Sequence, residues 1–230
     1  MPKPYFDIQQ FGEQTDIYIF GDIARCADEN SQDTSGHSLV QHLKKIPDAA
    51  EINLHIDSFG GNVSEGWAIY NALQSSRARV TSYADGFVAS AAIYPFLAGQ
   101  ERIASNVSAF YFHPASQLAA GYAEDLRSAA DALDQLTEIG LGAFTNAGME
   151  EQEARDLVNS KAWYSPAAML EKGIATSIRK AGDASGVSQS VRGLIVQQLM
   201  VPHKDETPPT EPHPKEPPAK LSLMQMLCNI

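Results

Sequence analysis

Residues 51–92 read EINLHIDSFGGNVSEGWAIYNALQSSRARVTSYADGFVASAA. Apolar and polar side chains alternate at its start, which predicts a strand at Glu51–Ile56 that ends in a glycine-rich turn. Apolar residues at helical spacing then predict a helix at Ser64–Ser75. A second strand is predicted at Arg79–Ala84, closed by Asp85-Gly86. A strand, a helix and a strand in this order predict a βαβ unit with two parallel strands.

The same alternation continues on both sides of this unit. Further strands are predicted at Thr15–Phe20 and Ser108–Phe112. Helices are predicted at Thr34–Lys45, Ala89–Leu97, Glu124–Phe144, Met149–Asn159 and Ala167–Lys172. Strands that alternate with helices at this spacing predict an α/β fold with a largely parallel sheet.

Composition divides the chain into four parts. Seven of the 13 prolines lie between Val201 and Lys220, where charged residues are also frequent. Such a segment buries too little apolar surface to offset its ordering entropy. We therefore predict an N-terminal extension at 1–13, a folded domain at 14–180, a Pro-rich flexible linker at 181–220 and a short apolar segment at 221–230.

The net charge of the chain is −11, from 17 basic and 28 acidic residues. This balance argues against a nucleic-acid partner and against an anionic membrane surface, because both need a cationic face. The sequence has no secretory start and no apolar stretch long enough to cross a bilayer, and Cys26 and Cys228 do not make a disulfide framework. These features predict a soluble, cytoplasmic protein.

Three features could carry chemistry. Gly60-Gly61 follows a strand and is either a tight turn or a place where backbone amides face a ligand. Ser90 stands among small residues and is either a packing residue or a nucleophile that a polypeptide can approach. His113 ends an apolar strand and is either structural or a general base. Metal-ligand spacings and phosphate-binding glycine motifs are absent, so we expect no metal and no cofactor.

In combination these motifs resemble the proteolytic subunit of Clp protease (ClpP), and most closely its phage branch of head maturation (prohead) proteases. The resemblance rests on Gly60-Gly61, on Ser90 within Gly86–Ala92 and on His113-Pro114, and runs from about Asp16 to Ile178. It implies a ClpP/crotonase-like spiral of ββα units with a long protruding helix, here Glu124–Phe144.

By position, the resemblance implies that Ser90 is the nucleophile and His113 its general base. Gly61 and Ala91 match the residues whose amides form the oxyanion hole, and Gly60-Gly61 matches the edge where the family binds its substrate as an added strand. The sequence departs from the family at the acidic third member, where Lys161 stands. Asn159 or Ser160 could orient His113 instead, Asp156 could reach it, or the pair could work as a slow dyad.

The resemblance implies a serine endopeptidase that processes phage capsid or scaffold proteins during head maturation. It also implies a homo-oligomeric ring, possibly stacked, in which the long helix forms the contact between rings. Three alternatives stay open: an ATPase-dependent degradative Clp subunit, an inactive assembly or scaffold protein that keeps the fold, and a crotonase-like acyl-CoA enzyme. A carboxylate is the usual partner of the histidine in serine proteases, so Lys161 is the main argument for an inactive relative.

Overall fold

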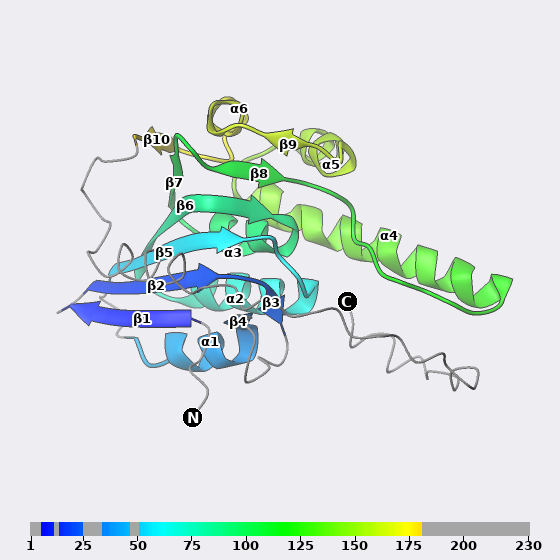
Figure 1. Cartoon of the computed structure of the whole chain (residues 1–230), viewed down its shortest axis with the longest axis horizontal. Coiled ribbons are helices and arrows are strands. Elements are labelled where there is room, and N and C mark those ends of the chain that lie inside the picture. Colours follow the sequence, from blue (N-terminus) through cyan, green and yellow to red (C-terminus); the bar gives the residue numbers. More distant parts are fainter. Residues whose placement is uncertain (1–5, 12–13, 25–33, 47–50, 181–230) are drawn as a thin grey trace, which may run out of the picture.

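The computed structural model describes residues 6–11, 14–24, 34–46 and 51–180 of the chain. The predicted linker 181–220 and apolar segment 221–230 lie outside the described residues, as do Cys26 and Cys228. Figure 1 shows one twisted sheet with α2 and α3 behind it, and α4 reaching far beyond the body of the molecule. Among the described helices, none is both long and apolar enough to cross a membrane.

The main sheet has eight strands and is mostly parallel, which confirms the α/β prediction. Its path is β1-β2-β5-β6-β7-β10, with β8 paired to the far end of β6 and β9 paired to β8. Only β1 on β2 and β9 on β8 pair antiparallel. The strands are β1 (Phe6–Phe11), β2 (Gln14–Phe20), β5 (Glu51–Ser58), β6 (Arg79–Ala89), β7 (Glu101–Ser105), β8 (Ala109–Tyr111), β9 (Trp163–Tyr164) and β10 (Ser177–Arg179).

Two further short strands, β3 (Ile23–Ala24) and β4 (Thr34–Ser35), pair with each other outside the main sheet. The helices are α1 (Gly36–Leu43), α2 (Val63–Ser75), the 3₁₀ turn η1 (Ser90–Ala92), α3 (Ile93–Leu97), α4 (Ala123–Asn146), α5 (Glu151–Asn159) and α6 (Pro166–Glu171). Strand side chains such as Leu54, Ile56 and Val80 pack with Ile69 of α2 and Phe96 of α3 in one core. Burial of this surface is the main favourable term for the fold.

The structure corrects three predicted boundaries. The strand predicted at Arg79–Ala84 does not stop at Asp85-Gly86 but continues as β6 to Ala89. The predicted helix at Ala89–Leu97 is divided into η1 and the short α3. The predicted N-terminal extension contains β1, whose backbone continues the sheet by pairing with β2 from Phe6↔Ile19 to Phe11↔Gln14.

Arg102 on β7 ties the C-terminal part of the domain to the sheet. Its buried guanidinium donates to the carbonyl oxygens of Ile174 (2.7 Å), Gly99 (3.0 Å) and Gly173 (3.0 Å). Burial lowers the pKa of this guanidinium below its usual value. The planar guanidinium therefore satisfies three main-chain carbonyl oxygens at the same time.

Arg102→Lys is expected to lower the free energy of unfolding by about 2–3 kcal/mol, because one ammonium cannot reach three separated carbonyls. Urea unfolding followed by circular dichroism measures the change. Arg79→Lys is the matched control, since Arg79 is exposed and pairs with Glu101 at the surface. An equal loss in both variants would contradict the role assigned to Arg102.

Candidate active site

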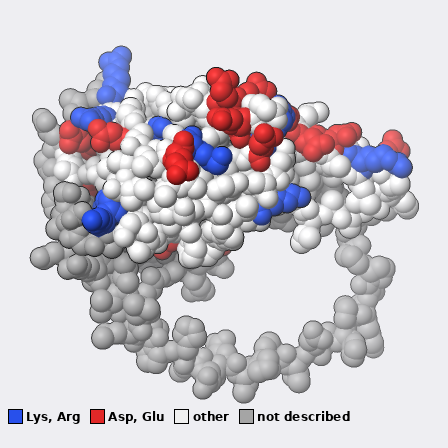
Figure 2. Space-filling view, turned by 90° about the horizontal axis from the view of Figure 1, so that it is seen from above, with Lys and Arg blue, Asp and Glu red and all other residues white. Residues whose placement is uncertain are grey.

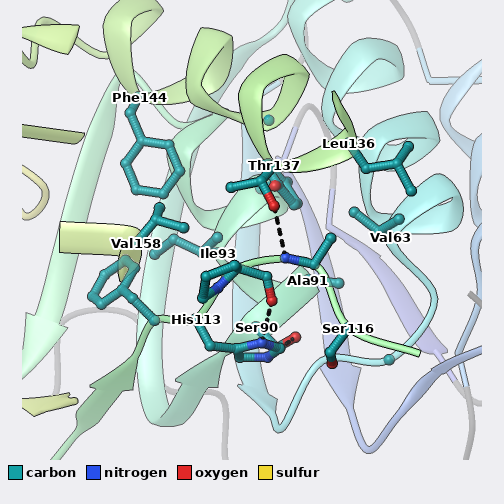
Figure 3. Close-up of a pocket in the computed structure, with 16 residues that line it drawn as sticks. Val63, Ser90, Ala91, Ile93, His113, Ser116, Leu136, Thr137, Phe144 and Val158 are labelled. Atoms are coloured by element: carbon teal, nitrogen blue, oxygen red, sulfur yellow. Dashed lines mark hydrogen bonds between the residues drawn. The ribbon is translucent and has the colours of Figure 1, made fainter. Parts of the chain in front are cut away.

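Ser90 occupies a strained turn at the end of β6. Its φ is +52°, a left-handed conformation that costs a residue with a side chain of order 1–3 kcal/mol. Ala89 before it is extended, and η1 begins at Ser90 itself. The change of direction at Ser90 turns the hydroxyl out of the buried strand and into a cavity beside α4, as Figure 3 shows.

Gly60 and Gly61 lie next to this turn and require the absence of side chains. Gly60 has φ +95°, and a Cβ there would lie 2.7 Å from both the Ala91 nitrogen and the Ser90 Cβ. Gly61 has φ +132°, and a Cβ there would lie 2.3 Å from the carbonyl oxygen of Ile23. The structure thus confirms a tight glycine turn packed directly against the serine turn.

The Gly60-Gly61 turn is fixed by main-chain hydrogen bonds to Ile23. The Ile23 N–H donates to the Gly60 carbonyl at 2.6 Å, and the Asn62 N–H donates to the Ile23 carbonyl at 2.7 Å. The Asn62 side chain then caps α2 by accepting from the amides of Ser64 and Glu65. The glycine turn therefore has little freedom to move relative to Ser90.

His113 lies just after β8 and contacts Ser90 directly. Its Nε2 is 2.7 Å from the Ser90 Oγ, and its Nδ1 is 2.6 Å from the carbonyl oxygen of Pro114. A carbonyl can only accept, so Nδ1 carries the proton and Nε2 presents its lone pair to the serine hydroxyl. The main chain thus sets the tautomer in which the imidazole can receive the serine proton.

The group that takes the place of the third triad member is not one of the side chains considered from the sequence. Among the described hydrogen bonds, none joins His113 to Asn159, Asp156 or Lys161. Asp156 is exposed and accepts from Gln152 on its own helix, and Ser160 donates to the Leu157 carbonyl. The Pro114 carbonyl takes the position facing Nδ1, at 2.6 Å.

The segment that follows His113 is anchored to α4. The Ala115 N–H donates to the Thr137 Oγ1 at 3.0 Å (Figure 3). The Thr137 hydroxyl in turn donates to the Leu133 carbonyl at 2.9 Å. Sequence reasoning did not identify Thr137, since a threonine inside a long helix carries no distinctive signal. Thr137 holds the segment that carries the Pro114 carbonyl, and so acts on His113 only indirectly, through that carbonyl.

An apolar cavity of about 80 Å³ opens beside the Ser90 hydroxyl. Gly61, Ala91 and His113 are among the residues that line it. Burial raises the pKa of the Tyr94 phenol, which also lines the cavity, so that hydroxyl stays neutral. Its other apolar walls, shown in Figure 3, are Val63, Ile93, Leu136, Phe144 and Val158. The cavity can take an uncharged side chain next to the serine.

A strip of aromatic rings extends from His113 across the ends of the strands. Tyr111 lies 5.7 Å from His113 and 4.9 Å from Trp163, measured between ring centroids. Phe87 lies 5.5 Å from Trp163 and 4.6 Å from Phe59. Because each ring contacts the next in space, the strip fixes the orientation of the Tyr111 and Trp163 side chains beside the imidazole.

Comparisons with known proteins agree with this architecture. Residues 12–181 match the protein family described as Clp protease. The ATP-dependent Clp protease proteolytic subunit 3 of Streptomyces avermitilis is 31% identical over 140 residues, covering 59% of this chain and 63% of that protein's own length. The solved structure of a mutant ClpP1 from Listeria monocytogenes superposes with a TM-score of 0.59 at 21% identity, covering 73% of this chain and 92% of the other. The chain therefore belongs to the Clp protease family.

Proposed function

We propose that the protein is a serine endopeptidase of the ClpP type, with Ser90 as nucleophile and His113 as general base. The observation that carries the proposal is the 2.7 Å contact between the Ser90 Oγ and the unprotonated Nε2 of His113. A serine hydroxyl is a weak nucleophile until a positioned base removes its proton. The strained turn at Ser90 and the tautomer set by Pro114 support the same roles.

In the proposed reaction, the Ser90 oxygen attacks a substrate carbonyl while its proton passes to His113 Nε2. The carbonyl oxygen becomes an oxyanion, which the backbone amides of Gly61 and Ala91 stabilise. His113 then gives its proton to the leaving amine as the peptide C–N bond breaks. A water molecule, deprotonated by the same imidazole, hydrolyses the acyl-enzyme and restores the serine.

The proposed substrate is an extended polypeptide. Gly60-Gly61 would pair with its main chain as an added strand, and the apolar cavity would take the side chain before the scissile bond. On the resemblance to head maturation proteases, we propose a phage capsid or scaffold protein as this polypeptide. A degradative role that depends on a partner ATPase is the second candidate, favoured by the similarity to the ATP-dependent Clp protease subunit of Streptomyces avermitilis.

We propose that the working form is a homo-oligomeric ring. The support is α4, which extends well beyond the body of the molecule in Figure 1 and carries the exposed apolar side chains Leu126 and Ile139. Apolar residues on a helix that protrudes from its own domain are suited to contact a second copy of the chain.

The first experiment is labelling of the purified full-length protein with a serine-reactive fluorophosphonate. We expect one labelled site, which peptide mass spectrometry locates at Ser90. Labelling elsewhere, or none, would contradict the proposed chemistry. A second assay incubates unlabelled protein with a capsid or scaffold substrate without nucleotide, and separately with an unfolded protein, a Clp ATPase and ATP. Cleavage of the first at defined sites supports maturation, and cleavage of only the second supports degradation.

A further inference from the structure

Lys161 is the second strained position at the site. Ser90 and Lys161 are the two non-glycine residues with positive φ in the described part of the chain, and Lys161 has φ +49°. It follows Ser160, the C-cap of α5, at a position where glycine or asparagine is the usual residue. A lysine there makes the domain less stable than either of those residues would, so its side chain calls for a functional explanation.

Lys161 lines an open groove of about 420 Å³ together with Tyr111, His113, Pro114, Ala115 and Ser116. The backbone of Lys161 is fixed on both sides. The helix α5 ends just before it, and Trp163, two residues after it, pairs with Tyr111 of β8. The side chain is exposed. Among the described residues that line the groove, Lys161 is the only one with a permanent charge, beside the titratable His113 and Tyr111.

His113 lines both this groove and the apolar cavity, together with Pro114, Ala115 and Ser116; Ser90 lines only the cavity, and Lys161 lines only the groove. In the proposed reaction the imidazole takes the serine proton and returns it to the leaving amine. The acyl side of the substrate occupies the apolar cavity, so the groove beyond His113 lies on the side of the leaving amine. In this arrangement a residue directly after the scissile bond would lie in the groove that Lys161 lines.

The charge of the surroundings makes this lysine selective. Acidic side chains gather on the face shown in Figure 2, with patches that continue toward the end that carries the tip of α4. The adjacent α5 alone contains Glu151, Glu153 and Asp156. The acidic side chains of α5 would repel a substrate carboxylate, whereas the Lys161 ammonium in the groove would attract it.

We propose that Lys161 selects an acidic residue, Asp or Glu, directly after the scissile bond. This inference rests on the proposed function and names its substrate class: polypeptides cleaved between an apolar and an acidic residue. An exposed ion pair of this kind changes kcat/KM by roughly 2–5-fold. Screening by salt reduces the preference, since the pair is open to solvent.

The test uses internally quenched peptides with Leu before the scissile bond and Glu, Gln or Lys after it, with cleavage sites located by mass spectrometry. The wild type is expected to favour Glu over Gln by roughly 2–5-fold in kcat/KM at low salt. Lys161→Asn removes the charge and suits the left-handed conformation, so its Glu/Gln ratio falls to about one and its Tm rises. Lys161→Glu prefers the Lys peptide.

Three outcomes overturn the inference. A wild-type ratio of one, or an unchanged ratio in Lys161→Asn, shows that the lysine does not read the substrate. A ratio insensitive to salt shows that the preference is not ionic. Arg155→Asn is the matched control, because Arg155 lies on the neighbouring α5 and pairs with Glu138 and Glu151 outside the groove. If no peptide is cleaved, the proposed function itself is overturned, and this result differs from the three outcomes that overturn only the role of Lys161.

Discussion

Ser90→Ala, His113→Ala and the double variant are expected to lower kcat/KM by the same factor, about 10³-fold. The two side chains act as one unit, so once either is gone the other contributes nothing further to the rate. Removing nucleophile or base from a complete serine triad costs roughly 10⁶-fold, and removing the acid alone roughly 10⁴-fold. Here His113 has the Pro114 carbonyl rather than a carboxylate, so part of that loss is already present in the wild type.

The measurement is kcat/KM on one cleavable peptide for the wild type, both single variants and the double variant. Ser128→Ala, on an exposed part of α4, is the control for the loss of a serine hydroxyl. Losses that multiply in the double variant would show that Ser90 and His113 act independently, and that the 2.7 Å contact between them is not the catalytic one.

Gly61→Ala is expected to lower kcat/KM by roughly 10²–10³-fold and the free energy of unfolding by about 2–3 kcal/mol. The added Cβ would lie 2.3 Å from the Ile23 carbonyl oxygen, at a φ of +132°. The turn has to move away from Ile23, and the Gly61 amide moves with it. An oxyanion donor displaced in this way no longer points at the developing charge.

Gly148→Ala separates the steric effect from backbone strain. Gly148 also has positive φ, +97°, but a Cβ there meets nothing within 4 Å. We expect it to cost only about 1 kcal/mol of stability, with unchanged kcat/KM. Thermal unfolding and fluorophosphonate labelling rates are compared for both variants. A folded Gly61→Ala protein that labels as fast as wild type would remove Gly61 from the proposed oxyanion hole.

The central βαβ unit could be predicted because its signals are local, whereas Gly60-Gly61, Ser90 and His113 each left alternatives open and pointed to a site only in combination. Alternation at Glu51–Ile56 and the paired glycines after it mark a strand and its turn without reference to the rest of the chain. The end of β6 could not be predicted in this way. From the sequence, Gly86 indicated a turn. In the structure it lies inside β6, where its missing Cβ makes room for the Asp57 carboxylate, which accepts from the Phe87 N–H at 2.9 Å.

The partner of His113 is beyond sequence reasoning for a different reason. Every residue has a carbonyl, so the Pro114 oxygen carries no sequence signature, and only the path of the chain brings it to Nδ1. The strands β7 and β10 were missed because they are short and contain polar residues. Their parallel pairing, Ser177↔Ile103 to Arg179↔Ser105, joins segments more than 70 residues apart.

The strand β6 changes its partner along its length. Thr81–Ala84 pair with β7 and Phe87–Ala89 with β8, while β5 lies along its other edge. Main-chain amides bonded on both edges of a buried strand exchange with solvent hydrogen only when the whole unit opens. Ser90 is therefore attached to the last part of the domain to open. Partial unfolding of α4 would release the segment after His113 from Thr137 but would leave Ser90 in its turn, so the nucleophile is expected to be held more firmly than its base.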